Sequence, residues 1–298
     1  MSILINKDTR VLVQGITGKS GSLQTQVMLE AGTKIVAGVT PGKAGQKVCG
    51  IPVYNYIRDA KAEVEFDTVI SFVPPMAAKE SCFEAIDAGI KLLVLTTEEI
   101  PMHDVVAIIQ YAKEHDTILV GPGCAGVIAP EICKVGAHPV RFFKKGKVGI
   151  VSKSGALSYE IGKTLSDHGI GQSCVVAIGG GPLWGFTQKD AIALYEKDPE
   201  TEVIVLLGEI GGSSEEEAAA FIKKYVNKPV VSLIVGRNAP TGKSLGHAGA
   251  IVSGNTGTAA SKIEALTDAN VTVVKSPTEL VEVIKSLQKR RKQNGSIY

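Results

Sequence analysis

The sequence predicts two α/β domains, each built around a mostly parallel β-sheet. Short β-branched runs alternate with amphipathic helical stretches, and most of these runs end in glycine-rich loops. The length of 298 residues suits two domains of ordinary size. Hydrophobic residues make up 44% of the chain and aromatic residues only 5%, with 33 glycines. This composition excludes extensive disorder and is typical of layered α/β structure with tight strand-to-helix turns.

The first half contains five apolar runs that we expect to be parallel strands. The first of them leads into a glycine loop and then a helical stretch that Gly32 ends. The five runs lie at 10–15, 34–39, 68–73, 92–96 and 117–121. Ligands of such sheets bind at the carboxyl ends of the strands, so the loops after these runs are the expected binding edge.

Between Gly126 and Gly146 the alternation of apolar runs and helical stretches becomes irregular. This segment contains prolines and the pair Lys144-Lys145. We place a linker at 126–146, which gives one domain at 1–125 and another at 147–298. A second strand set follows at 147–152, 173–178, 202–208, 229–236 and 271–275. The last helix is expected to begin at a capping box, Ser276-Pro277-Thr278-Glu279, with proline at the first helical position.

Charge and cysteine usage narrow the class of protein. The net charge of +2 offers no electrostatic case for a nucleic-acid partner, and no window approaches the length of a membrane span. The N-terminus lacks the apolar core of a signal peptide. The five cysteines are odd in number and lack CxxC spacing, so neither disulfides nor a metal site are expected. We therefore expect a reducing compartment, the cytoplasm or an organelle matrix.

The first loop has the spacing G-x-x-G-x-x-G, from Gly15 through Gly18 to Gly21. It approaches a dinucleotide fingerprint without matching it, but a glycine turn that opens a helix presents N–H groups to a phosphate. The second run leads into Pro41-Gly42-Lys43 and offers no carboxylate for a ribose hydroxyl. We predict a phosphate-bearing adenosine ligand and rank a nicotinamide-dependent dehydrogenase low.

A lone histidine, His247, lies in the small-residue stretch 242–254, where its neighbours leave an imidazole uncovered. The helix start at Ser154-Gly155 could hold a phosphoryl group beside it. Glu209 could bond one ring nitrogen and leave the other as a nucleophile, although it also reads as a carboxylate beginning the helix at 213–217. We expect four strand-ending loops to meet here: 152–155, 179–182, 209–212 and 242–249.

Three other features offer weaker signals. The stretch from Gly236 to Ser244 has five residues between its glycines where a P-loop has four, so a nucleotide would need a partner chain. Cys124 has the setting of a nucleophile, but a small buried cysteine is the commoner case. Trp184 could line a ligand pocket or a subunit contact, and the sequence leaves its role open.

Seven motifs, spread in order over nearly the whole chain, carry a family resemblance. They are VQGITGKSG (13–21), VTPGK (39–43), FVPP (72–75), AIDAGIKL (85–92), GIVSKSGALSYE (149–160), GEIGGSSEEEAAAF (208–221) and GHAGAIV (246–252). Together they resemble the α subunit of succinate–CoA ligase (succinyl-CoA synthetase). The wider family also supplies malate–CoA ligase, citryl-CoA synthetase and part of ATP-citrate lyase.

The resemblance implies a Rossmann-like CoA-binding domain followed by a flavodoxin-like ligase domain. It also implies a separate β subunit whose ATP-grasp domain binds ATP or GTP with Mg, in an αβ or α₂β₂ complex. ATP or GTP on that partner would phosphorylate a histidine, the phosphoryl group would pass to an acid, and CoA would attack the resulting acyl phosphate. The acid would be a small dicarboxylic or tricarboxylic acid.

The resemblance also assigns roles to individual residues. His247 matches the phosphorylated histidine, Glu209 the glutamate beside it, and Ser154 with Gly155 the helix start that holds the phosphate. The CoA-contacting positions it implies are Thr17, Gly18, Lys19, Ser20, Pro41, Lys43, Thr96, Thr97 and Glu98. The positions it places near the acid substrate are Tyr159, Gly123, Cys124 and Ala125.

Several positions depart from the succinate enzymes. The chain has GPGCAG, with Gly123 and Ala125, where they usually read GPNCPG, and Gly181 where they read aspartate in GGDP. Leu245 replaces a methionine, and Leu23-Gln24 a Phe-His pair. Losing an amide and a carboxylate opens volume and could admit malate or citrate, although family frequency favours succinate. A non-catalytic CoA-binding protein is an alternative to the ligase function. The intact pair of His247 and Glu209 argues against this alternative.

Overall fold

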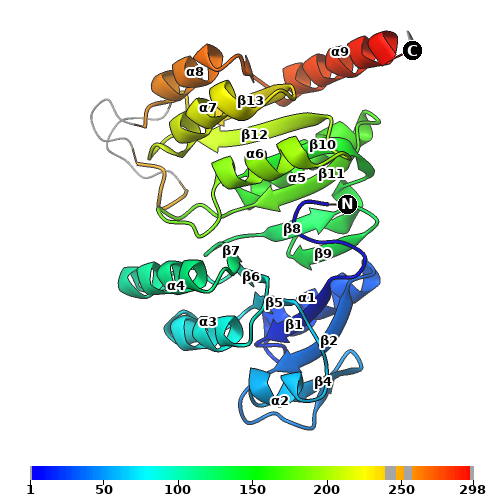
Figure 1. Ribbon diagram of the computed structural model, residues 1–298, viewed down its shortest axis with the longest axis vertical. Coiled ribbons are helices and arrows are strands. Elements are labelled where there is room, and N and C mark those ends of the chain that lie inside the picture. The colour runs from blue at the N-terminus through cyan, green and yellow to red at the C-terminus, as the bar shows by residue number, and fades with distance from the viewer. Residues whose placement is uncertain (1, 239–245, 252–256, 296–298) are drawn as a thin grey trace. The chain divides into compact units, whose positions relative to one another are not determined.

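The computed structural model describes residues 2–238, 246–251 and 257–295 (Figure 1). They form two compact units. The N-terminal unit comprises residues 4–140 and 177–186, and the C-terminal unit comprises the described residues of 1–3, 141–176 and 187–298. Two seven-stranded sheets organise the chain. Among the described residues no helix has the length and apolar character needed to cross a membrane.

The first sheet has the strand order β3-β4-β2-β1-β5-β6-β7. All of its neighbouring pairs are parallel except the short edge pair of β3 and β4. Its strands are β1 (Arg10–Gln14), β2 (Lys34–Val39), β3 (Lys47–Val48), β4 (Ile51–Tyr54), β5 (Thr68–Ser71), β6 (Leu92–Leu95) and β7 (Ile118–Val120). Without the edge strand β3, this is the 3-2-1-4-5-6 order of a Rossmann fold.

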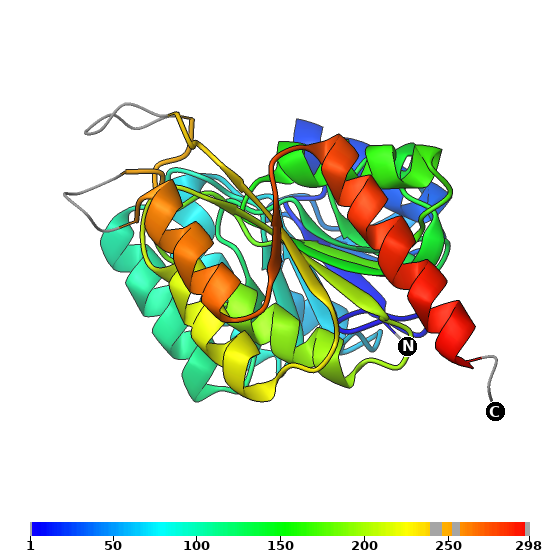
Figure 2. The ribbon, with the colours of Figure 1, turned by 90° about the horizontal axis from the view of Figure 1, so that it is seen from above.

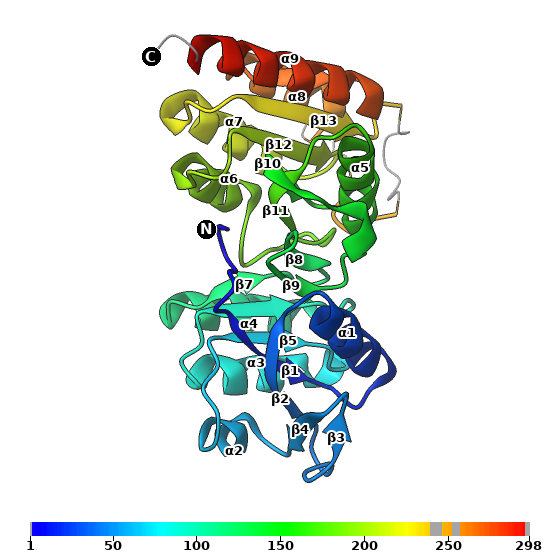
Figure 3. The same cartoon turned by 90° about the vertical axis from the view of Figure 1, so that its right-hand side faces the viewer.

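Helices cover both faces of this sheet. Figure 3 shows α1 on one face and α2, α3 and α4 on the other. The helices are α1 (Lys19–Glu30), α2 (Ile57–Lys61), η1 (Pro75–Ala77), α3 (Ala78–Asp87) and α4 (Met102–Glu114). The order of the sheet reverses between β1 and β5, so the loops that follow these two strands border the crevice where such folds bind ligands.

The second sheet has the order β14-β13-β12-β10-β11-β8-β9. Its strands are β8 (Gly126–Ala129), β9 (Cys133–Gly136), β10 (Lys145–Ser152), β11 (Gln172–Ala177), β12 (Val203–Glu209), β13 (Val230–Val235) and β14 (Thr272–Val274). From β10 to β14 the strands follow the 2-1-3-4-5 order of flavodoxin, so both predicted fold types are confirmed. This order reverses between β10 and β12, which pair in parallel with Ser152 opposite Leu207.

Helices also flank the strands β10 to β14. They are α5 (Gly155–Asp167), α6 (Gln188–Lys197), α7 (Ser214–Tyr225), α8 (Ala259–Asp268) and α9 (Pro277–Gly295), after the short η2 (Val140–Phe142). Figure 2 shows α9 on the opposite face of the sheet from α7 and α8. The helix α9 begins at Pro277, as predicted, although the Glu279 carboxylate bonds the residue before the N-cap and not the N-cap itself. Ser276 Oγ accepts the Glu279 N–H at 3.2 Å, and the Glu279 carboxylate accepts the N–H of Lys275 at 2.7 Å.

The stretch 126–146, expected to be a linker, carries regular structure. The strands β8 and β9 pair antiparallel with Gly126 opposite Gly136, and all of their residues are buried. A Cβ on Gly126 would lie 2.2 Å from the Val135 carbonyl oxygen, so this pairing needs glycine. The prolines of the stretch lie outside both strands, which is why it reads as irregular in the sequence.

Tyr195 joins two central strands of the second sheet. Its side chain is fully buried, and its hydroxyl lies 2.8 Å from the Ile150 carbonyl oxygen and 2.9 Å from that of Cys174. Gly149 leaves room for the ring, because a Cβ there would lie 2.5 Å from a ring carbon.

We predict that Tyr195→Phe lowers the free energy of unfolding by about 1–2 kcal/mol, because the two carbonyl oxygens lose a buried donor. Urea unfolding followed by circular dichroism measures this. The control is Tyr225→Phe at a tyrosine that is 54% exposed, which should change stability by less than ~0.5 kcal/mol. Equal effects of the two substitutions would contradict the assignment.

Candidate active site

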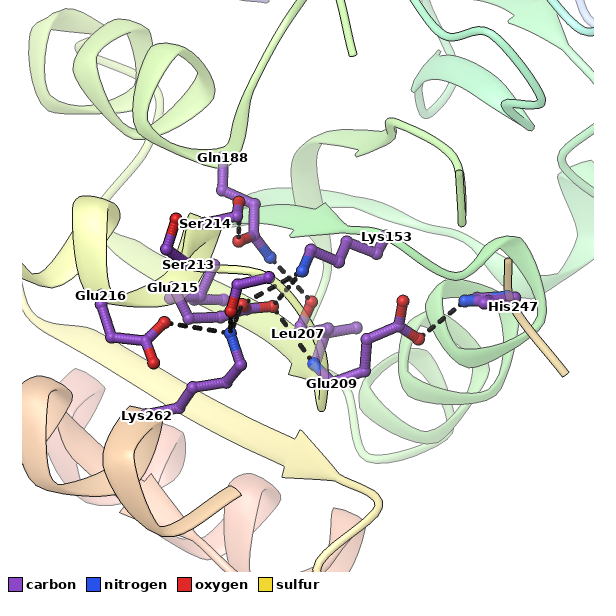
Figure 4. A network of polar contacts seen from close by, with 12 residues as sticks. Lys153, Gln188, Leu207, Glu209, Ser213, Ser214, Glu215, Glu216, His247 and Lys262 are labelled. Carbon is purple, nitrogen blue, oxygen red and sulfur yellow. Dashed lines mark hydrogen bonds and ion pairs between the residues drawn. The ribbon is translucent and has the colours of Figure 1, made fainter. Parts of the chain in front are cut away.

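The C-terminal unit brings Glu209 and His247 together. His247 Nδ1 lies 2.7 Å from Glu209 Oε2, and Figure 4 shows the carboxylate directed at the ring. The Glu209 side chain is 10% exposed and that of His247 29%. With its Nδ1–H donated to the carboxylate, a neutral imidazole carries its lone pair on Nε2. The contact therefore leaves the lone pair of a neutral His247 ring on Nε2.

The strand order explains where Glu209 lies. It is the last residue of β12, and β12 and β10 border the reversal of the flavodoxin-like sheet. The loop after β10 leads directly into α5, whose N-cap is Ser154. The Ser154 hydroxyl accepts the Leu157 N–H at 3.2 Å, and Ser152 Oγ accepts the N–H of Ser154 at 3.1 Å. The N-terminus of α5, with its partial positive charge, thus follows the strand beside the one that Glu209 ends.

Gly211 lets the backbone of the His247 loop approach the turn after β12. Its φ is +93°, and a Cβ there would lie 2.1 Å from the Gly249 carbonyl oxygen. Its N–H donates to the Gly257 carbonyl at 2.8 Å. On the other side of this contact, the His247 carbonyl accepts the Ala250 N–H at 3.1 Å. Backbone packing therefore holds the histidine loop against the turn that follows Glu209.

In the N-terminal unit, the glycine loop after β1 opens α1. A Cβ on Gly21 would lie 2.1 Å from the Gly15 carbonyl oxygen, so the third glycine lets the helix start against the turn. The N-cap is Gly18, and no side chain caps the helix there. The first N–H groups of a helix have no partner within it, and without a cap they suit an anionic ligand.

A second loop follows β2 and carries Lys43. Asn55 holds it, because its Oδ1 accepts the Gly42 N–H at 2.9 Å and the Ala44 N–H at 3.2 Å. Thr40 links this loop to the first one, with its Oγ1 3.4 Å from the Thr17 N atom. The positions expected to contact CoA in these two loops are exposed, except for the half-buried Thr17: Gly18, Lys19, Ser20, Pro41 and Lys43. Within the described ranges neither lysine forms an ion pair.

The two threonines after β6 turn their hydroxyls to the backbone. Thr96 Oγ1 donates to the Ser71 carbonyl and Thr97 Oγ1 to that of Val73, both at 2.7 Å. Glu98 is exposed. The N–H of Gly123 donates to the Thr97 carbonyl at 3.0 Å, which brings the altered GPGCAG segment beside these CoA candidates.

Cys124 has the environment of a structural cysteine. Its side chain is buried, and its Sγ donates to the carbonyls of Leu95 and Val120 at 3.3 Å. Burial raises the pKa of this thiol to about 12. A thiol that is protonated at neutral pH and bonded to backbone carbonyls is not poised for nucleophilic attack.

The segment 179–185 packs against the loop that holds Gly123. A Cβ on Gly179 would lie 2.4 Å from the Pro122 carbonyl oxygen, and the Gly185 N–H donates to the Gly121 carbonyl at 3.1 Å. Trp184 Nε1 donates to the Gly179 carbonyl at 2.8 Å. The side chain of Trp184, whose role the sequence leaves open, therefore links the two ends of the segment 179–185.

The expected meeting of four loops is seen in part. Residues 209–212 contact the described part of the loop around His247, whereas 242–245 lie outside the described residues. Residues 152–155 and 209–212 share the C-terminal unit, while 179–182 belong to the N-terminal unit. Tyr159 lies half-buried in the second turn of α5. Sequence reasoning missed Asn55, for which no motif gave a signal.

Comparison with known proteins identifies the family. Residues 6–99 match the CoA binding domain family and residues 151–272 the CoA-ligase family. The chain is 49% identical over 291 residues to the succinate–CoA ligase [ADP-forming] subunit alpha of Aquifex aeolicus, which covers 97% of this chain and 95% of that protein. It is 50% identical to subunit alpha 1 of Archaeoglobus fulgidus, covering 97% and 98%. The chain belongs to the succinate–CoA ligase alpha-subunit family.

The family confirms the resemblance seen in the sequence. The chain is a ligase subunit with a CoA-binding domain, and as an alpha subunit it has a beta-subunit partner. Among solved structures it matches a mutant ATP citrate lyase from Methanosaeta concilii in complex with (3S)-citryl-CoA, at TM-score 0.87 and 26% identity. That match covers 99% of this chain but 52% of the lyase chain, so the present chain spans about half of it. An acetyl-coenzyme A synthetase from Ca. Korarchaeum cryptofilum, at TM-score 0.78 and 19% identity, shares the fold over 94% of this chain and 61% of the synthetase chain.

We predict that Gly211→Ala lowers the ligase activity of the complex with the beta subunit on the order of 100-fold, because the added methyl group displaces the His247 loop. Gly212→Ala is the matched control. Gly212 also has a positive φ, +59°, but a Cβ there meets no atom of the described residues within 4 Å. It should retain most of its activity. Equal losses in the two variants would show that backbone strain alone matters.

We predict that iodoacetamide at pH 8 alkylates the exposed Cys49 and spares Cys124. With a pKa of about 12, about one Cys124 thiol in ten thousand is ionised at that pH. The thiolate fraction of Cys124 rises as the pH approaches 12, so the rate at which iodoacetamide alkylates Cys124 should increase with pH. Peptide mass spectrometry gives the order of modification, and the urea-unfolded chain shows that all five cysteines can react. Early alkylation of Cys124 in the folded protein would contradict its burial.

Proposed function

We propose that this chain, with its beta subunit, catalyses the reversible, nucleotide-driven formation of an acyl-CoA from a dicarboxylic acid and CoA, through a phosphohistidine at His247. The observation that carries the proposal is the 2.7 Å contact between His247 Nδ1 and Glu209 Oε2. The N-terminus of α5, which opens from the neighbouring strand, supports it. The printed names of the relatives, succinate–CoA ligases that form ADP, agree with it.

The contact suits phosphoryl transfer to and from the ring. Nε2 attacks the terminal phosphorus of the nucleotide, and the nucleoside diphosphate leaves. As the ring gains positive charge, the Glu209 carboxylate stabilises the Nδ1–H that it already holds. The Gly155 N–H and the positive end of α5, which Ser154 caps, stabilise the phosphoryl oxygens. The phosphoryl group then passes to the carboxylate of the acid, and the CoA thiol displaces phosphate from the acyl phosphate.

The two loops of the N-terminal unit are the proposed CoA site. The uncapped start of α1 offers N–H groups to phosphate oxygens, and Lys19 and Lys43 supply positive charge beside them. In this proposal the loop after β1 lines the site with Thr17, Gly18 and Ser20, and the loop after β2 lines it with Pro41. Thr96 and Thr97 shape the loop that presents Glu98, since their hydroxyls are engaged with backbone carbonyls.

The nucleotide site belongs, in this proposal, to the beta subunit. The described loops of this chain carry no P-loop spacing, so an ATP-grasp domain on the partner would bind ATP or GTP with Mg. We propose an αβ or α₂β₂ complex. The five cysteines carry free thiols, which suits a reducing compartment such as the cytoplasm.

Succinate is the proposed acid, with malate or citrate as the alternative. The altered positions Gly123, Ala125 and Gly181 lie in two segments that pack against each other. Among the described residues, a Cβ at Gly181 would meet within 4 Å only the Leu183 carbonyl oxygen, at 3.9 Å, so the glycine there leaves space rather than relieving a clash. The likeness to the citrate lyase structure favours citrate as the second candidate.

We predict that γ-labelled ATP transfers its label to His247 when the chain is purified with its beta subunit. The label should be stable to base, labile to acid and absent in His247→Ala. Glu209→Gln should slow its formation about 10- to 100-fold, because a neutral amide does not balance the positive charge that the ring gains. Failure to label, with ATP binding to the complex demonstrated, would leave a non-catalytic CoA-binding protein.

The same phosphorylated complex identifies the acid. Succinate, malate or citrate is added separately with CoA, and the loss of label is followed over time. Discharge by succinate alone shows that Gly123, Ala125 and Gly181 are tolerated changes. Discharge by malate or citrate alone makes these three positions the candidates for specificity, which Gly181→Asp then tests.

A further inference from the structure

A buried cluster of charges lies on the other side of Glu209 from His247 (Figure 4). It consists of Glu215 at the start of α7, Lys262 in α8 and Lys153 before α5, with Glu216 at its rim. The side chains of Glu215 and Lys262 are fully buried and that of Lys153 is 2% exposed, while Glu216 is 27% exposed. Buried charges destabilise a fold unless they are paired and hydrogen-bonded, so this cluster needs a physical explanation.

Both oxygens of the Glu215 carboxylate are engaged. Oε1 accepts the backbone N–H of Glu209 at 3.2 Å and lies 2.9 Å from Lys153 Nζ. Oε2 lies 3.1 Å from the same ammonium group and also accepts a bond from Lys262 Nζ. A carboxylate has about four lone-pair sites, and these contacts use them all. Glu215 thus joins the end of β12, the loop after β10 and the helix α8.

The groups that Glu215 joins are those that place the reacting atoms. Lys153 directly precedes Ser154, the N-cap of the helix proposed to hold the phosphoryl group. Glu209, whose N–H it accepts, holds His247 by its side chain. Lys262 fixes the far end of the same turn, because its Nζ donates to the Gly212 carbonyl at 2.9 Å. One buried carboxylate therefore sets the Glu209 backbone and the phosphate-holding loop relative to each other.

We propose that Glu215 is a positioning residue for phosphoryl transfer, acting through Glu209, while Lys153 and Lys262 hold the Glu215 carboxylate in place. The inference rests on the proposed phosphohistidine function. The length of the Glu215 side chain matters as well as its charge, since only a side chain that reaches Glu209 and both lysines together holds the three elements in register.

The test uses Glu215→Asp in the complex with the beta subunit. This variant keeps the negative charge but shortens the side chain by one methylene group, so it cannot reach all of its partners. We expect the rate of phosphohistidine formation to fall about tenfold or more, with the KM values for CoA and the acid unchanged. Glu216→Gln is the matched control on the neighbouring residue. Glu216 contacts Lys262 and Ser261 but, in the described chain, neither Glu209 nor Lys153, so its rate should stay near that of the wild type.

A double-mutant cycle separates positioning from general stability. If Glu215 acts by orienting Glu209, then Glu215→Asp should slow the Glu209→Gln enzyme less than about twofold further. A purely structural role predicts the same factor in both backgrounds and a loss in thermal midpoint that matches the loss in rate. Should Glu215→Asp not fold, the charge-balanced pair Glu215→Gln with Lys262→Met removes one carboxylate and one ammonium group together, and the same slowing is expected.

The outcomes distinguish this inference from the proposed function. If the wild-type complex takes the label and the Glu215→Asp variant takes it equally fast, the positioning role is overturned, whereas the phosphohistidine is retained. Equal factors in the two Glu209 backgrounds overturn it as well. A wild-type complex that takes no label overturns the proposed function and this inference with it.

Discussion

The hydrogen bond between Glu209 and His247 decides which ring nitrogen can react, and much of the C-terminal unit serves to place it. Glu209 ends a strand whose every residue is buried, so its backbone has little freedom. The sheet reverses its order beside this strand, which puts the opening of α5 on the neighbouring strand. The close contact at Gly211 then holds the histidine loop against the same turn. The placement of the proposed phosphoryl acceptor and of the helix start beside it thus follows from strand order and backbone packing.

The charges around this hydrogen bond are arranged in two layers. The inner layer is the buried carboxylate of Glu215 with its two lysines, and the outer layer is the pair of Glu209 and His247. Ion pairs as deeply buried as the inner ones contribute little net stability, because desolvation offsets their attraction. Their directional bonds nevertheless restrict three elements at once. We therefore regard the inner layer as a source of geometry more than of stability.

The main strands were predictable because buried parallel strands read as continuous apolar runs, and β2 has the bounds that its run predicts. The strands β3 and β4 were not, since β3 has two residues and β4 contains Pro52 and is mostly half-buried. The site residues came from motifs and a family resemblance, which name positions but not contacts. The buried cluster could not be foreseen. The run of glutamates at 215–217 reads as a solvated helix start, and only the fold shows that the first of them is enclosed.

The glycines divide into those that define loop geometry and those that leave space, and this division bears on substrate choice. At Gly21, Gly179 and Gly211 a side chain would strike a backbone oxygen within 2.4 Å, so these positions hold the loops in place. At Gly181 the nearest atom to an added Cβ is 3.9 Å away. A change at such a position alters the volume and polarity of its surroundings without moving the loop. We therefore expect that exchanging residues of the second kind accommodates different acids on one framework, while the geometry proposed for phosphoryl transfer in the C-terminal unit stays the same.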